Sequence, residues 1–532
     1  MPSDISLRNR FAYKLASNIG SALLGLATIA VVPRALGPAD YGRFEFLSVN
    51  FKLILDSLTL HVPTAFFNWI SRKAHKEDAD VPVGVTLYAV MGASLFFLTA
   101  IALSIASGAH ATLWPDIPPV YLWEGYGLTV AVFLFQLCAY LADGKALTVV
   151  LEKQRFAQNA AKTGIFLLLA GVGFLSLHTY FMSQILVIGV SAAVTITWLY
   201  RRKAFTVKVI KPWLLPSAEI GRYFTFLKGY ISPLVVLIAV AFIFSYFDRW
   251  FLQFIGGSSQ YGYFGLSDRL GAVAIIFTTA MSPLLTREFA FAYEEVDKIR
   301  LANLFDRIRI FLFLAAVVSC FLSVSSAPLV ELIGGDKFKE AIIPIAIMAL
   351  YPIQQTFGQL SASLMIATGQ TGLYAKIGIL ATVAGIPITY FLMAPQTYTV
   401  PGLGIGATGL AVKIVVVSIL GTNVQLYYNT KYLGISFMKW IILQVKVVSI
   451  LYAASRAAYF LINRIPGDFL QSLNFLYLTP AAYGALVRIA LAGLAYLAMI
   501  VLLVFAAPDL AGIGRDDIRH FYRQYINKGT TL

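Results

Sequence analysis

The sequence predicts an all-α integral membrane protein with about fourteen transmembrane helices, in two pseudo-symmetric six-helix lobes followed by a C-terminal helix pair. Of its 532 residues 59% are hydrophobic and 13% are charged, whereas soluble domains have about 25% charged residues. The apolar residues gather in runs of about 18 to 30, long enough to cross a bilayer core of roughly 30 Å. A short motif also recurs 220 residues apart, between long apolar segments in both places. Such a duplication is typical of transporters built from two related bundles.

The apolar runs predict the individual helices in chain order. They lie near 11–33, 44–70, 83–106, 122–142, 160–177, 181–200, 224–254, 262–286, 310–327, 341–367, 373–394, 404–428, 440–462 and 481–506. We expect four parts: an N-lobe over 1–200, a basic cytoplasmic linker over 201–222, a C-lobe over 223–430, and the helix pair with a cytoplasmic tail over 431–532.

The distribution of Lys and Arg tests this count. With a cytoplasmic N-terminus, 28 of these residues fall in inside segments and five fall outside. The five outside are Arg34, Arg43, Lys337, Lys339 and Arg464. This asymmetry follows the positive-inside rule, and merging the fifth and sixth helices would destroy it. We therefore expect both termini inside, and interpret the basic and apolar stretch 287–309 as an amphipathic helix at the inner interface.

Several functional classes are disfavoured by the same composition. The net charge of +15 reflects topology signals, so we exclude nucleic acid as a partner. Cys138 and Cys320 fall inside predicted spans, which argues against disulfides and metal clusters. No predicted outside segment exceeds about 20 residues, which leaves no room for an extracellular enzymatic domain. We expect no catalytic residues, no cofactor and no metal.

The repeated motif defines equivalent positions in the two lobes. Residues 37–44 read GPADYGRF and residues 257–264 read GSSQYGYF, with six identities in the 27 positions from 37 to 63. The same offset pairs Pro63 with Pro283. A proline inside a helix removes a backbone hydrogen bond and permits a kink. The two prolines are therefore hinge candidates for alternating access, with packing that involves no motion as the alternative.

Eight Lys and Arg residues fall within the predicted spans. A charge at the bilayer centre costs about 2.5 to 3.5 kcal/mol on insertion scales, so each needs a physical reason. Snorkelling to the nearer interface accounts for four of them. Those four are Lys228, Lys446, Arg456 and Arg488.

The other four are candidates for a cationic cavity. Lys52 and Lys413 lie deep in their helices, while Arg249 and Arg269 lie on the helices that the repeat marks as equivalent. Structural ion pairing is the alternative, above all for Lys52, since Asp56 follows four residues later. A cavity with excess positive charge implies an anionic substrate, and Arg suits phosphate because its planar fork makes paired hydrogen bonds.

Arg34 precedes the first copy of the motif, and is either an interface anchor or a further cation at the mouth of that cavity. With the motif at residues 32–44, the chain resembles the Wzx-type polysaccharide flippases. Their superfamily, the multidrug/oligosaccharidyl-lipid/polysaccharide exporters, also holds the peptidoglycan-precursor flippases and the multidrug and toxic-compound extruders. The resemblance covers about residues 7–430. Many Wzx-type members have twelve spans, so the last helix pair is more similar to the fourteen-helix peptidoglycan-precursor branch.

The resemblance implies a flippase that moves undecaprenyl-pyrophosphate-linked oligosaccharide from the inner to the outer leaflet of the bacterial cytoplasmic (inner) membrane. This step serves polysaccharide, O-antigen and lipopolysaccharide biosynthesis, with membrane lipids and the polysaccharide polymerase and chain-length machinery as further partners. Carried over by position, the substrate contacts would be Arg34, Lys52, Arg249, Arg269 and Lys413. The alternatives are a peptidoglycan-precursor flippase and a drug/cation antiporter on the same fold. Scarce intramembrane carboxylates argue against the antiporter.

Overall fold

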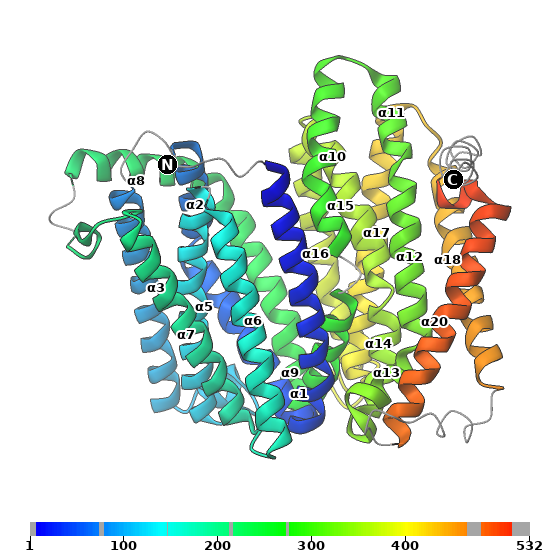
Figure 1. Cartoon of the computed structure of the whole chain (residues 1–532), viewed down its shortest axis with the longest axis horizontal. Coiled ribbons are helices and arrows are strands. Elements are labelled where there is room, and N and C mark those ends of the chain that lie inside the picture. Colours follow the sequence, from blue (N-terminus) through cyan, green and yellow to red (C-terminus); the bar gives the residue numbers. More distant parts are fainter. Residues whose placement is uncertain are drawn as a thin grey trace, which may run out of the picture. The chain divides into compact units, whose positions relative to one another are not determined.

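The computed structural model describes residues 7–73, 79–145, 147–211, 216–272, 276–464 and 480–512. Regular structure in these ranges is helical, and none of the described residues forms a strand (Figure 1). Eleven helices among them are long and apolar enough to cross a membrane. These observations confirm the predicted all-α membrane fold, and the chain is a multi-pass membrane protein.

The chain divides into two compact units, Met1–Gly262 and Tyr263–Leu532. The first contains α1 (Leu7–Leu58), α2 (Val62–Lys73), α3 (Asp80–Ala106), α4 (His110–Leu113), α5 (Pro119–Gly144), α6 (Thr148–Gly171), α7 (Leu177–Arg201), η1 (Val207–Ile210), α8 (Ser217–Ile231), η3 (Ser232–Leu234) and most of α9 (Val235–Ala272). The second contains the end of α9, then α10 (Ile276–Glu294), α11 (Lys298–Asp306), α12 (Ile308–Val324), α13 (Ser326–Ile333), η5 (Gly335–Ala341), α14 (Ile342–Met348), α15 (Tyr351–Ala367), α16 (Thr371–Met393), α17 (Gly406–Leu433), α18 (Phe437–Ile462), α20 (Pro480–Ala506) and η6 (Pro508–Ala511).

The predicted spans fall on these helices, with some differences in where the helices break. The separation of the fifth and sixth spans is confirmed, because α6 ends at Gly171 and Ser176 caps α7 with a reciprocal hydrogen-bond pair to Thr179. The predicted span 44–70 is instead interrupted, since α1 ends at Leu58 and α2 begins at Val62. Long α1 and α9 each contain parts of two predicted spans, which makes eleven long helices compatible with about fourteen crossings.

In the first unit, α1 lies along α6, and α5 packs between α2 and α7. One of its apolar cores joins Phe66 and Ile70 of α2 to Leu141 of α5 and Leu199 of α7. Another contains Tyr223 of the amphipathic α8, whose buried hydroxyl hydrogen-bonds the hydroxyl of Thr86 at 3.1 Å. The apolar faces of these helices are thus buried against one another.

In the second unit, α12, α15, α17, α18 and α20 surround one apolar core. Trp440 of α18 is buried in this core, with its ring centroid 5.1 Å from that of Phe305 and 5.4 Å from that of Phe357. The prediction of an amphipathic interface helix over 287–309 was wrong. This segment contains the end of α10 and all of α11, which meet at a turn (Figure 1). Its residues Phe289, Leu301 and Phe305 are buried in this core. Amphipathic periodicity does not distinguish a protein core from a lipid interface, which explains the difference.

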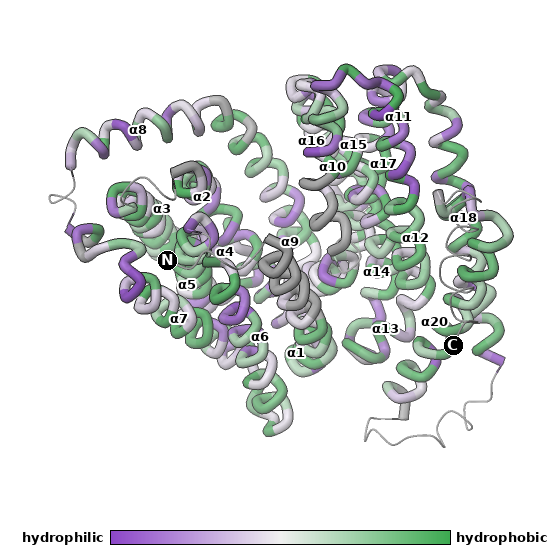
Figure 2. Tube along the Cα trace, turned by 45° about the horizontal axis from the view of Figure 1, so that its top comes forward, coloured by the Kyte–Doolittle hydropathy of each residue, from purple (hydrophilic) through white to green (hydrophobic). Residues whose placement is uncertain are grey.

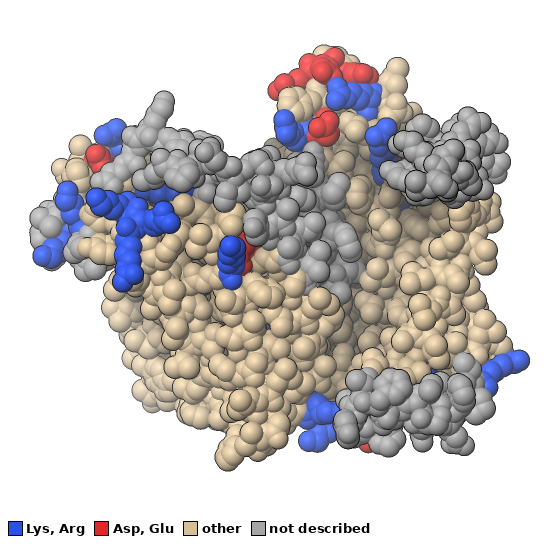
Figure 3. Space-filling model, in the orientation of Figure 1, with Lys and Arg blue, Asp and Glu red and all other residues tan. Residues whose placement is uncertain are grey.

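The surface also matches a membrane environment. Large apolar side chains are strongly exposed on α3, α6 and α20, with Phe96, Leu168 and Leu502 at 64%, 65% and 68%. Apolar residues follow most of the helix lengths in Figure 2, while Lys and Arg gather toward the helix ends in Figure 3. Burial in lipid explains this exposure, because hydrocarbon solvates these side chains as water does not.

Candidate functional site

The two copies of the motif share an unusual backbone conformation. α1 bends at Gly37, with φ 76° and ψ 172°, and α9 bends at Gly257, with φ 68° and ψ −176°. Positive φ combined with extended ψ is essentially restricted to glycine, because any Cβ would clash with the backbone. The duplication seen in the sequence therefore extends to the same glycine bend in both copies.

The two motifs pack directly against each other within the first unit. A Cβ on Gly42 would lie 1.8 Å from the carbonyl oxygen of Ser258, and one on Gly262 would lie 2.1 Å from that of Pro38. Pro38 and Ser258 occupy equivalent positions in the motif, as do Gly42 and Gly262. The contact is thus reciprocal, and we call these four residues the turn contact. Only glycine allows the backbones to approach this closely.

Aromatic side chains fix the turn contact on either side. Tyr41 and Tyr261, the tyrosines before the two glycines, are 3% and 2% exposed. The ring of Tyr261 meets Phe46 of α1 edge to face, with centroids 5.2 Å apart. Such pairs contribute about 0.5 to 1.5 kcal/mol beyond their area burial. The contact between α1 and α9 is therefore closely packed.

Asp116, in the segment before α5, connects the same two motifs. Its carboxylate accepts hydrogen bonds from Arg43 Nη2 at 3.2 Å and from the backbone N–H of Ser258 at 3.0 Å. Its carbonyl oxygen accepts two more, from Arg43 Nε at 3.0 Å and from Ser258 Oγ at 3.4 Å. Partial burial by itself raises the pKa of Asp116, but the hydrogen bonds from Ser258 and Arg43 and the charge of Arg43 outweigh it and hold the pKa below its ordinary value.

Further hydrogen bonds hold α9 against the segment that carries Asp116. Trp250 Nε1 donates to the carbonyl oxygen of Thr112 at 3.0 Å, and Gln253 Nε2 donates to that of Pro115 at 2.8 Å. Three positions separate Trp250 from Gln253, so both lie on one face of α9. At this end of the first unit, α1 and α9 are closed together by packing, hydrogen bonds and an ion pair.

The second unit contains a polar cavity between α15, α16 and α17, with a volume of about 360 Å³. Lys413 is the cation among its lining residues, and no described lining residue is acidic. The polar lining comes mainly from Tyr351, Gln355, Gln359, Thr382, Ser418, Thr422 and Gln425. Gly385 makes room for the lysine, because a Cβ there would lie 2.8 Å from Lys413 Cε. The cavity thus offers one positive charge among neutral hydrogen-bonding groups.

An apolar groove runs along a different face of α17. Its volume is about 380 Å³, and its lining is Ile419, Leu420, Asn423, Val424, Tyr427, Tyr428 and Phe437. Leu420 is 57% exposed and Val424 43%. One helix, α17, therefore separates a cationic polar cavity from an exposed apolar groove.

Three predicted cavity cations lie in the first unit. Arg34 is exposed on α1, three residues before the bend. Lys52 Nζ forms an ion pair with Asp56 at 2.5 Å and lies 5.8 Å from the ring centroid of Phe133, so the pairing that the sequence offered as an alternative is present. Arg249 is half-buried on α9 and donates to the carbonyl oxygen of Ser245 at 3.3 Å.

The other two lie in the second unit. Lys413 lines the polar cavity and is 9% exposed. Arg269 is exposed near the end of α9, next to Asp268, whose charge acts on the hydroxyl of Tyr351 in the cavity wall. The structure therefore brings one of the predicted cations, Lys413, into a defined cavity, and Arg269 is not among the described lining residues of that cavity. Substrate contact by all five stays a prediction.

The hinge candidates occupy different settings. Pro63 is the second residue of α2, immediately after a break in which Leu60 and His61 have φ of 48° and 55°. Proline is favoured in the first turn of a helix, because backbone N–H groups there have no intrahelical acceptor and proline loses no hydrogen bond by lacking one. Pro63 is therefore not the mid-helix kink that we expected. Pro283 does lie within α10, and its side chain falls outside the described residues.

Two groups of polar residues were missed from the sequence. Asp116 stands in a short segment between prolines, where nothing local indicates a partner 142 residues away. The glutamines of α15 carried a usable signal, because Gln355 and Gln359 are one turn apart on a predicted membrane span. Uncharged polar side chains in a membrane helix face the interior of the bundle, where they find hydrogen-bonding partners.

The chain is a multi-pass bundle of helices with paired glycine bends and a polar cavity. Comparison with solved structures shows that its fold is similar to that of transporters of the MOP superfamily. A lipid II flippase, MurJ, in an inward closed conformation matches with a TM-score of 0.65 at 13% identity, over 93% of this chain and 99% of that one. An inward-facing MATE family multidrug resistance transporter matches with a TM-score of 0.56 at 16% identity, over 80% and 98%.

A MOP superfamily transporter from Pyrococcus furiosus, described as having a binding pocket of reverse polarity, matches with a TM-score of 0.50 at 16% identity, over 80% of this chain and 94% of that one. No protein-family model matches the chain, and no curated protein matches it. At these identities, the likeness shows the fold alone.

Proposed function

We propose that this chain is a flippase that moves an undecaprenyl-diphosphate-linked oligosaccharide from the cytoplasmic to the outer leaflet of a bacterial inner membrane. The observation that carries the proposal is the position of α17 between a cationic polar cavity and an apolar groove. A substrate that fits both must have an anionic, hydroxyl-rich head and a long apolar tail. A lipid-linked oligosaccharide has both parts.

Lys413 would bind the diphosphate of the head group. Its ammonium is a compact point charge, and burial strengthens its attraction for phosphate because the local dielectric is low. The amides of Gln355, Gln359 and Gln425 can both donate to and accept from sugar hydroxyls. Because these amides are neutral, sugars bound there can leave again without breaking an ion pair.

The apolar groove would keep the polyprenyl tail in contact with the bilayer. Its exposed aliphatic and aromatic side chains cover apolar chains without requiring a fixed register. The head can then cross through the polar interior while the tail stays in hydrocarbon. Arg34, Lys52, Arg249 and Arg269 would supply further cations along the path of the head, in agreement with the charge pattern of the spans.

The turn contact joins α1 and α9 within the first unit through four motif residues, with Asp116 holding both motifs by hydrogen bonds. Opening and closing of this contact would be the conformational change that alternating access requires of the first unit. No covalent chemistry is needed at any step.

A second candidate, a peptidoglycan-precursor flippase, is favoured by a specific observation. The similarity to the lipid II flippase extends over 93% of this chain, against 80% for the MATE transporter. The two candidates share the diphosphate and the polyprenyl tail and differ in the sugar. A drug/cation antiporter is disfavoured, because a cavity whose described lining has one cation and no acid does not favour cationic drugs.

The test is transport in proteoliposomes by a Lys413→Gln variant. The rate at which a defined undecaprenyl-diphosphate oligosaccharide becomes accessible to an external lectin should fall about tenfold or more, since a hydrogen bond to a charged group contributes about 1.5 to 3 kcal/mol. Lys431→Gln is the matched control, because it removes the same charge from an exposed position on α17 and should leave the rate unchanged.

Equal rates for Lys413→Gln and Lys431→Gln would remove the cavity from the transport path. Lipid II and a cationic dye serve as alternative substrates in the same vesicles. Faster transport of lipid II would favour the second candidate, and transport of the dye but of neither lipid would reject the flippase.

A further inference from the structure

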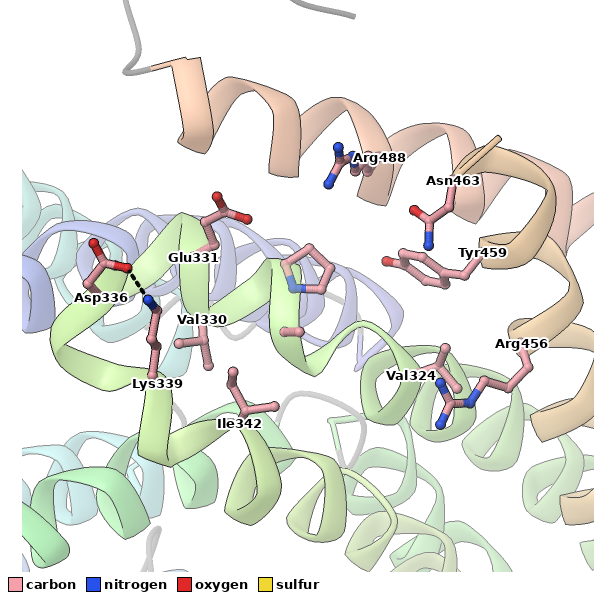
Figure 4. A pocket seen from close by; sticks show the side chains of 13 residues that line it. Val324, Val330, Glu331, Asp336, Lys339, Ile342, Arg456, Tyr459, Asn463 and Arg488 are labelled. Carbon is pink, nitrogen blue, oxygen red and sulfur yellow. Dashed lines mark ion pairs between the residues drawn. The ribbon is translucent and has the colours of Figure 1, made fainter. Parts of the chain in front are cut away.

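A second cavity in the second unit lies where α13 and η5 face the C-terminal helix pair, α18 and α20 (Figure 4). Its volume is about 530 Å³, and we call it the end cavity. It shares no lining residue with the Lys413 cavity or with the apolar groove. The end cavity is therefore a separate candidate site, which the proposed transport path does not use.

Two arginines from different helices converge on the end cavity. Arg456 lies six residues before the end of α18 and Arg488 eight residues after the start of α20, about 9 Å and 12 Å inside their helices at 1.5 Å per residue. Both side chains are exposed and extend toward the space between the helix pair and α13 (Figure 4). Snorkelling alone would allow these side chains to point anywhere along the interface, so their convergence needs another reason.

The charges in the end cavity are arranged on two sides. On the α13–η5 side, Lys339 forms an ion pair with Asp336 at 2.8 Å, and Glu331 also acts on Lys339 (Figure 4). On the helix-pair side, neither Arg456 nor Arg488 has a carboxylate within ion-pair distance among the described residues. The guanidinium of Arg456 lies instead 5.7 Å from the ring centroid of Tyr452. Positive charge therefore predominates on the helix-pair side.

Neutral hydrogen-bonding groups stand between the arginines. Asn463 contributes an amide at the end of α18, and Tyr459 lies beneath it, with its hydroxyl hydrogen-bonded to Ser325 Oγ at 2.7 Å. Figure 4 shows both side chains directed into the end cavity. The two guanidinium groups and the amide are all hydrogen-bond donors, and phosphate oxygens accept paired, charge-assisted hydrogen bonds from such groups.

The surroundings favour a lipid as the source of that phosphate. Phe460 and Leu461, beside the end cavity on α18, are 60% and 52% exposed and offer apolar contact for acyl or prenyl chains. Basic pockets between membrane helices are known to bind lipid head groups on the cytoplasmic side of membranes, and the same phosphate chemistry is available in the end cavity. We propose that the end cavity binds the phosphate head of a membrane lipid through Arg456 and Arg488, and that this binding is the role of the C-terminal helix pair.

The test is native mass spectrometry of the full chain in detergent, with dioleoylphosphatidylglycerol, undecaprenyl diphosphate and inorganic pyrophosphate added separately. We expect wild type to retain at least one of the two lipids, and the Arg456→Gln/Arg488→Gln variant to bind that lipid at least tenfold more weakly. Arg464→Gln is the matched control, since it removes an exposed charge from the same end of α18 that does not line the end cavity. The Arg456→Lys/Arg488→Lys variant, which keeps the charge, reports on folding and should retain part of the binding.

The two lipids distinguish the sources of the phosphate. Stronger retention of phosphatidylglycerol indicates a bulk phospholipid site, and stronger retention of undecaprenyl diphosphate indicates a site for the carrier lipid. Displacement of either lipid by pyrophosphate supports the phosphate contact. Equal lipid retention by the double glutamine variant and by Arg464→Gln would overturn the proposal, as would binding of pyrophosphate without either lipid. Because the proposed transport cavity also binds a polyprenyl diphosphate, the undecaprenyl diphosphate comparison is made in the Lys413→Gln background. Lys413→Gln by itself should leave the retention of phosphatidylglycerol unchanged, so failure here and failure of the transport proposal are distinguishable.

Discussion

The two copies of the repeated motif have the same backbone and different side chains. Gly37 and Gly257 share one bend, and Gly42 and Gly262 make reciprocal close contacts. Around them, the first copy carries a charged Arg43 where the second has a tyrosine. What both copies keep is therefore the geometry that brings α1 and α9 together.

The difference between the copies concerns how Asp116 is bound. The first copy reaches it with the guanidinium of Arg43, and the second with the backbone N–H and hydroxyl of Ser258. One carboxylate cannot lie at symmetric places in both halves. The glycine contact between the two copies is thus symmetric, whereas the hydrogen bonds to Asp116 are asymmetric. Substitutions can test these two kinds of contact separately.

The largest effect on stability is expected when a side chain is added at Gly42 or Gly262, where the two backbones approach each other. Gly42→Ala and Gly262→Ala each place a Cβ within 2.1 Å of a carbonyl oxygen, so the helices must move apart. Overpacking of this kind costs about 1 to 3 kcal/mol, and we expect the upper end for backbone contacts. Thermal unfolding in detergent should show similar falls in Tm for both variants.

Gly25→Ala is the control on α1, because no atom lies within 4 Å of its Cβ position, and it should leave Tm unchanged or slightly raised. The double variant Gly42→Ala/Gly262→Ala should cost less than the sum of the singles, since one separation relieves both clashes. Additive losses, or a loss in one copy alone, would contradict the reciprocal contact.

A smaller effect is expected at the paired bends. Gly37→Ala and Gly257→Ala should each cost about 1 to 3 kcal/mol, because L residues do not adopt positive φ with extended ψ. Asparagine should not rescue either position. At Gly434, with φ 69° and ψ 26°, asparagine should be tolerated, because it readily adopts the left-handed helical conformation. Comparison of Tm for the three Gly→Asn variants checks this, and rescue at Gly37 by asparagine would refute the shared bend.

These effects rest on features that the sequence revealed only in part. The apolar runs predicted the helices, because a membrane span needs a fixed length of apolar chain. The repeat paired Gly37 with Gly257 and Gly42 with Gly262, although it did not predict the bends or the close contacts that these glycines form. It could not show that Gly42 faces Ser258, since two equivalent turns can pack together or point apart with identical sequences.

The candidate site residues were likewise predicted only in part from the sequence. Lys413 was identified because a charge deep in an apolar helix needs a reason, whereas Asp116 was missed because a carboxylate in a loop needs none. The segment 287–309 was placed at the interface because its periodicity is the same whether the apolar face meets lipid or protein. A charge inside a membrane span can thus be recognised as a candidate site residue from the sequence, whereas contacts between neutral polar groups can be found only in the structure.

The smallest effect on stability is expected when the contacts of Asp116 are weakened. Asp116→Asn should lower stability by about 0.5 kcal/mol, because the Asp116 side chain is 48% exposed and ion pairs near water contribute little. Asp40→Asn is the matched control: Asp40 also pairs with Arg43, at 2.9 Å, but no hydrogen bond connects its side chain to α9 among the described residues. Asp116→Asn should open the contact between α1 and α9, measured by cysteine cross-linking from α1 to α9, more than Asp40→Asn does.

The pH dependence has a definite sign. Because the pKa of Asp116 in the folded protein lies below its ordinary value, its contribution is complete above that ordinary value and is lost as pH falls through the folded-state pKa. The difference in Tm between wild type and Asp116→Asn should therefore be constant from pH 8 to about pH 5 and shrink only below about pH 4. A difference that shrinks already near pH 6 would mean that the carboxylate is not held by Arg43 and Ser258. The two copies of the motif would then be joined by the glycine contacts and the aromatic packing without the carboxylate.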